Sequence, residues 1–302
     1  MDRSGYTTDV AVVVLLLFID VLLLSVTNFH LLWRPEIVFL AAGVVLAGIA
    51  WFYLCVRRVP GLGHMAGAGS VLVLFTNFAA VLNYILAGSL VLPLQDRVFD
   101  AEDRVLGMNW LALYQWVVSH PILDAACNFF YVSLGPEMIL LFLLLEGLGL
   151  HSHAMAFRRW FIVSALITIA CGILIPAGGA FAFYKLPIAQ TTPCIIQVAA
   201  LRDGTLRLID LSNAQGLVAF PSFHAALAMF CAAAASKIKF LAIPGVIFNA
   251  LIIFTALPVG GHYFVDALAG IALAVLVIVP APALAWARRP AAEMLPVRQN
   301  SR

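Results

Sequence analysis

Residues 10–33 read VAVVVLLLFIDVLLLSVTNFHLLW, an apolar run that contains one carboxylate, Asp20. A helix needs about 20 mostly apolar residues to cross a bilayer, so this run predicts a membrane-spanning helix. The run is longer than the apolar core of a signal peptide, and no small-residue cleavage site follows it. We therefore expect it to be retained as the first membrane helix.

The composition of the whole chain points the same way. Of its 302 residues, 64% are hydrophobic and only 11% are charged, whereas soluble domains have about 45–50% apolar and about 25% charged residues. So few charges cannot cover a water-exposed surface, which excludes a soluble enzyme, a disordered chain and a nucleic-acid-binding protein. The five cysteines show no metal-ligand spacing, so we expect no disulfide framework, no metal site and no cofactor.

Further apolar runs predict an all-α polytopic transmembrane helix bundle of about eight membrane helices. Before the fourth helix, Trp110, Tyr114 and Trp116 predict a helix that lies in the membrane interface. A long polar loop, 185–216, precedes the sixth helix. We divide the chain into N-terminal membrane helices (1–94), an interfacial segment (95–120), a membrane core (121–287) and a cytoplasmic tail (288–302). The predicted helices are 10–33, 36–56, 69–94, 121–150, 160–184, 217–236, 240–258 and 264–286.

The basic residues of the connections predict the orientation of these helices. With both termini inside, 11 of the 17 lysines and arginines lie on the cytoplasmic side and six lie outside. Cytoplasmic loops carry an excess of basic residues. The short inner loops each carry a basic pair, for example Arg57 with Arg58 and Arg158 with Arg159. The alternative is that one marginal helix is misassigned.

Two histidines begin helices that start on the predicted outer side, His224 in FPSFHAALA and His262 in GGHYFVDALAG. A helix N-terminus presents unpaired N–H groups and a partial positive charge, which suit an anion. Pro221 suits the first turn of such a helix, Ser222 offers a hydroxyl, and Gly261 permits close approach of the backbone. The two termini together predict a site for a lipid phosphate at the outer face.

The spacing of His262 and Asp266 places both side chains on one face of a helix. A carboxylate there can accept a hydrogen bond from one imidazole nitrogen, which leaves the other as a nucleophile or base. The alternative is that His262 and Asp266 form a polar pair with a structural role and no catalytic function. A carboxylate at the membrane edge is costly and is usually functional, and PSFH on the same predicted side favours a catalytic role for Asp266.

These two stretches resemble the second and third motifs of the type 2 phosphatidic acid phosphatase superfamily. HYFVD is similar to the inositol phosphorylceramide synthase branch, and YVSLGPEM (131–138) shows a looser likeness. The resemblance implies a metal-independent reaction in which His262 attacks phosphorus and forms a phosphohistidine. It further implies that Asp266 orients His262, and that His224 protonates the leaving oxygen and later activates water or an acceptor hydroxyl.

The chain departs from the family pattern at two arginines. Thr255 and Ala256 occupy the positions of a Ser-Arg pair, and Thr192 stands where the first motif has arginine after Lys185. A phosphoryl transition state still needs cationic donors. The outer candidates are Lys185, Arg202 and Arg207, of which we favour Arg202. The alternative for all three is a solvated loop charge.

Two residues of the fourth predicted helix are weaker candidates for a substrate cavity. Tyr131 lies on the stretch that resembles the family, and Glu137 follows Pro136 near the middle of the helix. For Glu137 two alternatives stay open, a hydrogen bond to a neighbouring helix or a place in a lipid-access cleft.

We therefore expect an integral membrane enzyme that moves a phosphate-linked, inositol-phosphate-like head group between membrane lipids. The missing arginines suit a phosphodiester, which carries one negative charge, and the resemblance adds a role in sphingolipid metabolism. Hydrolysis of a lipid phosphate monoester is the nearest alternative. A transporter and a catalytically inactive lipid-binding relative are alternatives of other classes. We expect lipid partners, no nucleic acid, and a bacterial plasma membrane, with a Golgi-type membrane as the alternative.

Overall fold

The computed structural model describes residues 3–186 and 192–279. Five helices of this part are long and apolar enough to cross a membrane. They are α1 (Arg3–Val26), α2 (Trp33–Trp51) with its π-helical extension η1 (Phe52–Val56), α3 (Pro60–Ser89), α6 (Pro121–Gly147) and α7 (His151–Leu174). Three shorter apolar helices follow, α10 (Phe223–Ala235), α11 (Ala242–Thr255) and α12 (Phe264–Ile278). The predicted all-α polytopic bundle is confirmed.

Four membrane helices begin earlier than the sequence predicted, namely α1, α2, α3 and α7, and the differences are largest for α3 and α7. The third begins at residue 60 rather than 69, with Pro60 in the first turn, where proline is favoured. The fifth begins at residue 151 rather than 160, so Arg158 lies inside the helix. Arg158 is 4% exposed and its guanidinium forms an ion pair of 2.6 Å with Asp9 of α1. It is therefore a buried, paired charge inside a helix and not part of the short inner loop to which the sequence assigned it.

The two polar segments also contain more regular structure than the sequence predicted. The interfacial segment forms two helices, α4 (Asp96–Val105) and α5 (Trp110–Val118), because Asn109 caps the second by accepting the amide of Ala112. The polar loop contains α9 (Thr192–Asp203), the strand β2 (Leu208–Ile209) and the 3-10 helix η2 (Leu211–Asn213). The short α8 (Ala180–Phe183) precedes it, and β2 pairs in parallel with β1 (His30–Leu31). The predicted tail 288–302 lies outside the described residues, as does the predicted helix beyond residue 279.

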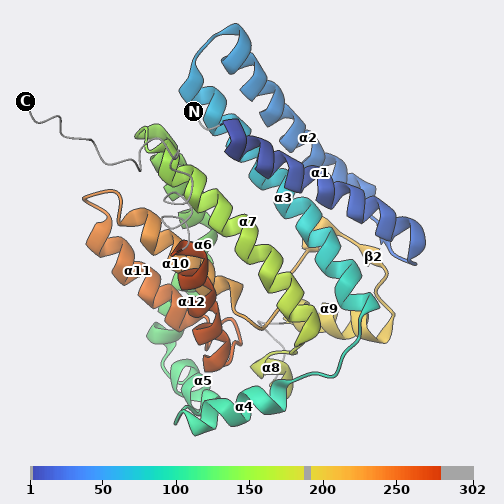
Figure 1. Cartoon of the computed structure of the whole chain (residues 1–302). Helices are drawn as coiled ribbons and strands as arrows, with labels where there is room; N and C mark the ends of the chain where they lie inside the picture. Colours follow the sequence, from blue (N-terminus) through green and yellow to red (C-terminus); the bar gives the residue numbers. More distant parts are fainter. Residues whose placement is uncertain (1–2, 187–191, 280–302) are drawn as a thin grey trace, which may run out of the picture.

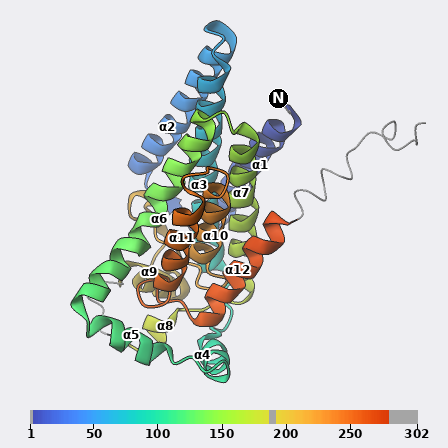
Figure 2. The same ribbon diagram turned by 90° about the vertical axis from the view of Figure 1, so that its left-hand side faces the viewer.

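The helices form two groups that meet along α3 and α7. The first group is α1, α2 and α3, and the second is α6, α7, α10, α11 and α12. The helix α10 packs against α6, α7, α11 and α12. The short helices α4, α5 and α8 lie together at one end of the bundle, where α12 begins (Figures 1 and 2). The other end is where α1 and α7 begin.

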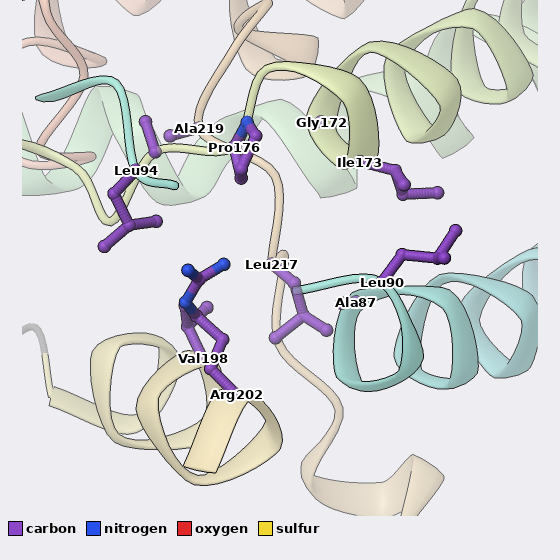
Figure 3. Close-up of a pocket in the computed structure, with 11 residues that line it drawn as sticks. Ala87, Leu90, Leu94, Gly172, Ile173, Pro176, Val198, Arg202, Leu217 and Ala219 are labelled. Carbon is purple, nitrogen blue, oxygen red and sulfur yellow. The ribbon is translucent and has the colours of Figure 1, made fainter. Parts of the chain in front are cut away.

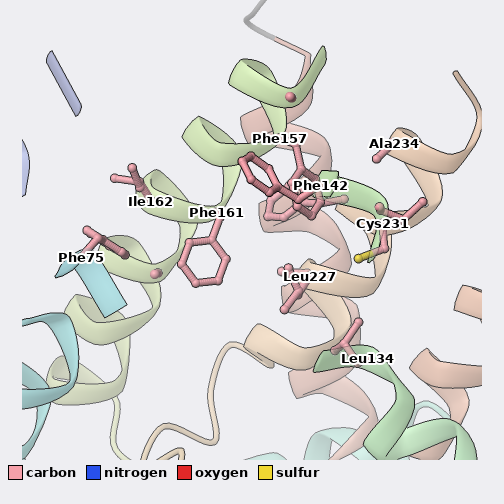
Figure 4. Close-up of a cluster of buried hydrophobic side chains, with 14 of the residues drawn as sticks. Phe75, Leu134, Phe142, Phe157, Phe161, Ile162, Leu227, Cys231 and Ala234 are labelled. Carbon is pink, nitrogen blue, oxygen red and sulfur yellow. The ribbon is translucent and has the colours of Figure 1, made fainter. Parts of the chain in front are cut away.

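The core between the two groups is apolar and aromatic. Phe75 of α3, Phe142 of α6 and Phe161 of α7 belong to one buried cluster together with Leu227 and Cys231 of α10 (Figure 4). The sequence of α10, FHAALAMFCAAAA, is rich in alanine, and small residues allow membrane helices to approach closely. The close packing of α10 fixes the position of its N-terminus relative to α12.

Candidate active site

The N-termini of α10 and α12 meet at the end of the bundle closed by α4, α5 and α8. The backbone amide of Ser222 donates a hydrogen bond of 2.9 Å to the backbone oxygen of Asp266. Gly270 makes this approach possible, since a Cβ on it would lie 2.2 Å from the backbone oxygen of Ser222. The two motifs that the sequence placed on one side are thus held together by the backbone.

His262 is held by two groups on its Nδ1 side. Its Nδ1 lies 2.9 Å from the backbone oxygen of Ala219 and 3.6 Å from Oδ2 of Asp266. A carbonyl oxygen can only accept, so Nδ1 carries the proton and donates it to Ala219. The partner of the hydrogen bond is therefore the carbonyl of Ala219, with Asp266 slightly farther away than we expected. In this tautomer Nε2 keeps its lone pair, which is what a nucleophile needs.

Asp266 is completely buried beside this imidazole. Its Oδ2 accepts the backbone amide of Tyr263 at 2.9 Å, while Oδ1 has no hydrogen-bond partner among the described residues. A carboxylate without full pairing is costly to bury. Positive charge that develops on His262 during a reaction would relieve this cost, because the carboxylate would then face an imidazolium.

His224 lies on the other side of the same site. Its ring stacks in parallel on Tyr131 of α6, with 4.1 Å between the ring centroids and 4° between the planes. Gly260 connects this pair to His262, since a Cβ on Gly260 would lie 2.8 Å from the Tyr131 ring and 3.1 Å from the His262 ring. Nε2 of His224 is buried and has no hydrogen-bond partner in the described part of the chain. The structure therefore brings both histidines and Tyr131 together.

The N-terminus of α12 is not the open anion site that the sequence predicted. The carboxylate of Asp103 accepts the amides of Phe264 at 2.8 Å and Val265 at 2.9 Å. Asp103 is 1% exposed, and burial raises its pKa while the two N–H groups act in the opposite direction. A carboxylate of the protein therefore takes the place that we assigned to a substrate phosphate.

Ser222 and Gly261, predicted to bind phosphate, have structural roles in this arrangement. The hydroxyl oxygen of Ser222 caps α10 by accepting the amide of Ala225 at 3.3 Å, so Pro221 lies before the cap and not in the first turn. Gly261 has φ of 68°, and its backbone oxygen accepts the amide of Ala180 at 2.8 Å. Both residues shape the loops that carry the histidines.

Of the three predicted phosphate-binding cations, Arg202 shares a cavity with the loop that precedes the motif of His224. Its guanidinium faces a cavity of about 30 Å³, which is lined by Pro176, Leu217 and Ala219 among others (Figure 3). Ala219 is the residue whose carbonyl binds His262. Arg202 also donates a hydrogen bond of 2.6 Å to the backbone oxygen of Leu92. It is thus oriented towards the motif loop rather than towards solvent.

The other two cations have different surroundings. Lys185 is exposed after α8, in a left-handed backbone conformation with φ of 51°. The guanidinium of Arg207 lies 4.7 Å from the ring centroid of Phe29 and donates to the backbone oxygens of Leu201 and Leu206. Arg207 therefore joins α9 to the loop after α1.

Glu137 forms a hydrogen bond to a neighbouring helix, which was one of the two roles that the sequence left open. Its Oε1 accepts Nδ2 of Asn249 at 2.7 Å, so it connects α6 to α11. The other oxygen, Oε2, is buried without a hydrogen-bond partner in the described ranges.

Sequence reasoning missed the residues that connect α4 and α5 to the site. Asp96 accepts the amides of Gly178 and Gly179 and the hydroxyl of Tyr263, and Nε1 of Trp110 donates to the backbone oxygen of Leu257. The available signal was the spacing of Asp96 and Asp103, which are seven residues apart and share a helix face.

The fold and the site define an integral membrane protein with two histidines and a carboxylate gathered at one end of its helices. The sequence pattern of the PAP2 superfamily matches residues 98–279, more than half of the chain, so the chain belongs to this superfamily. Its members are phosphatases or phosphotransferases, which supports an enzyme that acts on lipid-type substrates. No curated protein and no solved structure matches the chain significantly.

Proposed function

We propose that the protein transfers a phosphate-linked head group from one membrane lipid to the hydroxyl of another. His262, Asp266 and His224 would carry the reaction. The observation that supports this most strongly is the pairing of His262 Nδ1 with the carbonyl of Ala219, because it leaves the Nε2 lone pair for phosphorus. The inositol phosphorylceramide synthase branch, which HYFVD resembles, uses substrates of this kind.

The reaction would proceed in two steps. First, Nε2 of His262 attacks phosphorus, the bond from phosphorus to the donor lipid oxygen breaks, and His224 gives that oxygen a proton. The head group is then bound through phosphorus to His262. Second, His224 takes the proton from an acceptor hydroxyl, whose oxygen attacks phosphorus and releases His262. The carboxylate of Asp266, 3.6 Å from His262 Nδ1, stabilises the charged imidazole between the steps.

Thr192 and Ala256 replace two arginines of the family pattern, and this lower cationic charge favours a phosphodiester over a monoester. No lysine or arginine side chain of the described residues forms a hydrogen bond or an ion pair with His224, His262 or Asp266. A dianionic monoester calls for several cationic donors, whereas a singly charged diester needs fewer. Arg202 is the residue that we propose to supply this charge.

A second proposal concerns the orientation in the membrane. We infer that the end with His262 faces away from the cytoplasm, because the topology predicted from the sequence places 11 of the 17 lysines and arginines on the cytoplasmic side. In a variant without native cysteines, Thr205→Cys should react with an impermeant reagent from outside, and Ser236→Cys only from inside. Labelling of Thr205→Cys from the cytoplasmic side alone would contradict this orientation.

The transfer reaction can be tested with the purified protein in lipid nanodiscs. We would supply labelled phosphatidylinositol or a labelled lipid phosphate monoester, each with and without ceramide or diacylglycerol. We expect movement of the head group that depends on the acceptor and that is lost in His262→Ala. Rapid release of phosphate from the monoester, without acceptor dependence and without turnover of the diester, would show that the enzyme is a phosphatase.

A further inference from the structure

A second and larger cavity lies at the other end of the bundle, where α1 and α7 begin. Its volume is about 340 Å³, which is within the range of small-molecule sites. Its walls come from α1, η1, α3, α6 and α7, and they include Tyr6, Leu54, His64, Glu146, Met155 and Arg158. The helix α7 connects this cavity to the catalytic end. From Arg158 to Leu174 it rises roughly 25 Å, so the two sites are separate.

The polar groups of this cavity offer hydrogen-bond donors to an occupant. The carboxylate of Glu146 binds Nδ1 of His151 at 2.6 Å, and that of Asp9 binds Nε and Nη2 of Arg158 at 2.8 and 2.6 Å. Nε2 of His151 and Nη1 of Arg158 have no hydrogen bond to the described part of the chain, and His64 lies edge-on to the His151 ring. Nδ1 of His151 donates its proton to Glu146, so Nε2 of the neutral ring is an acceptor, and Nη1 of Arg158 is the donor that these two residues present to the cavity.

The charge around the cavity also favours an anion. Arg57 and Arg58 are exposed in the turn between η1 and α3, and Arg159 lies 3.9 Å from Asp9. Together with Arg158, these arginines exceed the two carboxylates, Asp9 and Glu146, by two positive charges. The end of the bundle that holds the cavity therefore has an excess of positive charge, which favours an anionic occupant.

The remaining walls are apolar. A small inorganic anion would leave these walls without a contact, so it fits the cavity less well than a ligand with an apolar part. Leu54 and Met155 line the cavity together with Gly63 and Gly67, whose missing side chains let Leu54 and Tyr6 pack closely against α3. We propose that this cavity binds an anionic phospholipid, with its phosphate at Arg158 and its acyl chain along Leu54 and Met155. This site is independent of the reaction proposed for His262.

The proposal can be tested with a phosphatidic acid that carries a photoreactive group on its acyl chain. The full-length protein in detergent would be irradiated with this probe, and the labelled peptides would be identified by mass spectrometry. We expect label in the peptide with Met155, competed by unlabelled phosphatidic acid but not by phosphatidylcholine or inorganic phosphate. Competition by inorganic phosphate, or equal competition by phosphatidylcholine, would overturn the proposal.

Two variants test the cavity and its charge separately. Met155→Trp should fill the cavity and abolish labelling of this region, while Arg57→Gln should weaken binding about fivefold, the effect of one basic residue near a lipid surface. Arg34→Gln is the matched control, because Arg34 is an exposed arginine at the opposite end of α2. If Met155→Trp does not fold, the labelling of Arg57→Gln tests the proposal by itself. Binding that is unchanged in Arg57→Gln, or reduced equally in Arg34→Gln, would refute an anion site here.

Discussion

Replacing Asp103 with asparagine should disturb the catalytic end of the protein although the residue does not belong to the predicted motifs. Asp103 of α4 is buried, and its two oxygens accept the amides of Phe264 and Val265, the first residues of α12. His262 lies two residues before Phe264. Loss of these hydrogen bonds should therefore let the loop that carries His262 move relative to His224.

The size of the effect follows from the hydrogen bonds that change. A hydrogen bond to a charged group contributes about 1.5–3 kcal/mol, and a neutral one about 1 kcal/mol. Asparagine keeps one acceptor and places an NH₂ group against the second amide, so one charged bond is lost and the other becomes neutral. We expect a loss of about 2–4 kcal/mol, which corresponds to a fall of roughly 5–10 °C in the unfolding temperature.

The assay is thermal unfolding in detergent together with kcat for head-group transfer. Misplacement of a reacting group by about 1 Å can lower the rate about 100-fold, so kcat should fall by between one and two orders of magnitude. Glu102→Gln is the matched control, since Glu102 is the exposed neighbour on α4. If Asp103→Asn unfolds and reacts like the unmodified protein, then α4 does not hold the N-terminus of α12 in place.

Three further substitutions test other parts of the site. Gly270→Ala should lower stability by about 1–3 kcal/mol, because its Cβ would meet the backbone oxygen of Ser222 at 2.2 Å; an unchanged unfolding temperature would refute the close approach. Tyr131→Phe should keep kcat, and Tyr131→Ala should lower it through loss of the ring stacked on His224, so equal kcat values for the two variants would argue against a role of the stack. Glu137→Ala should destabilise the fold by about 1–3 kcal/mol by removing the partner of Asn249, with kcat of the folded fraction unchanged; a kcat loss larger than the folded fraction explains would place Glu137 in the reaction.

Much of the fold could be predicted from the sequence, because membrane helices are specified by local composition. Runs of about 20 apolar residues predicted the eight helices, whose apolar surfaces face one another and the lipid. The starts of α3 and α7 were wrong for a physical reason. Gly63 and Arg158 look like loop residues, but Gly63 packs against Leu54 and Arg158 is neutralised by Asp9, a residue 149 positions away. Pairing over such a separation is not visible in a local pattern.

The candidate site could also be predicted only in part. The proximity of His224 and His262 could be predicted, because both begin helices on the same side of the membrane. The roles of Asp103 and Ala219 could not, since they depend on how α4 and the loop before α10 pack against α12. The N-terminus of α12 does bind an anionic group, as the sequence predicted. That group is the carboxylate of Asp103 and not a substrate phosphate.

The most direct test of the proposed chemistry is to identify the residue that becomes covalently bound to the head-group phosphate. The protein would be mixed with phosphatidylinositol without an acceptor, quenched under alkaline conditions, digested and analysed by mass spectrometry. We predict an acid-labile inositol phosphate adduct on the peptide with His262, absent in His262→Ala and discharged by ceramide or diacylglycerol. An adduct on another residue, or turnover without any adduct, would contradict the proposal that His262 is the nucleophile.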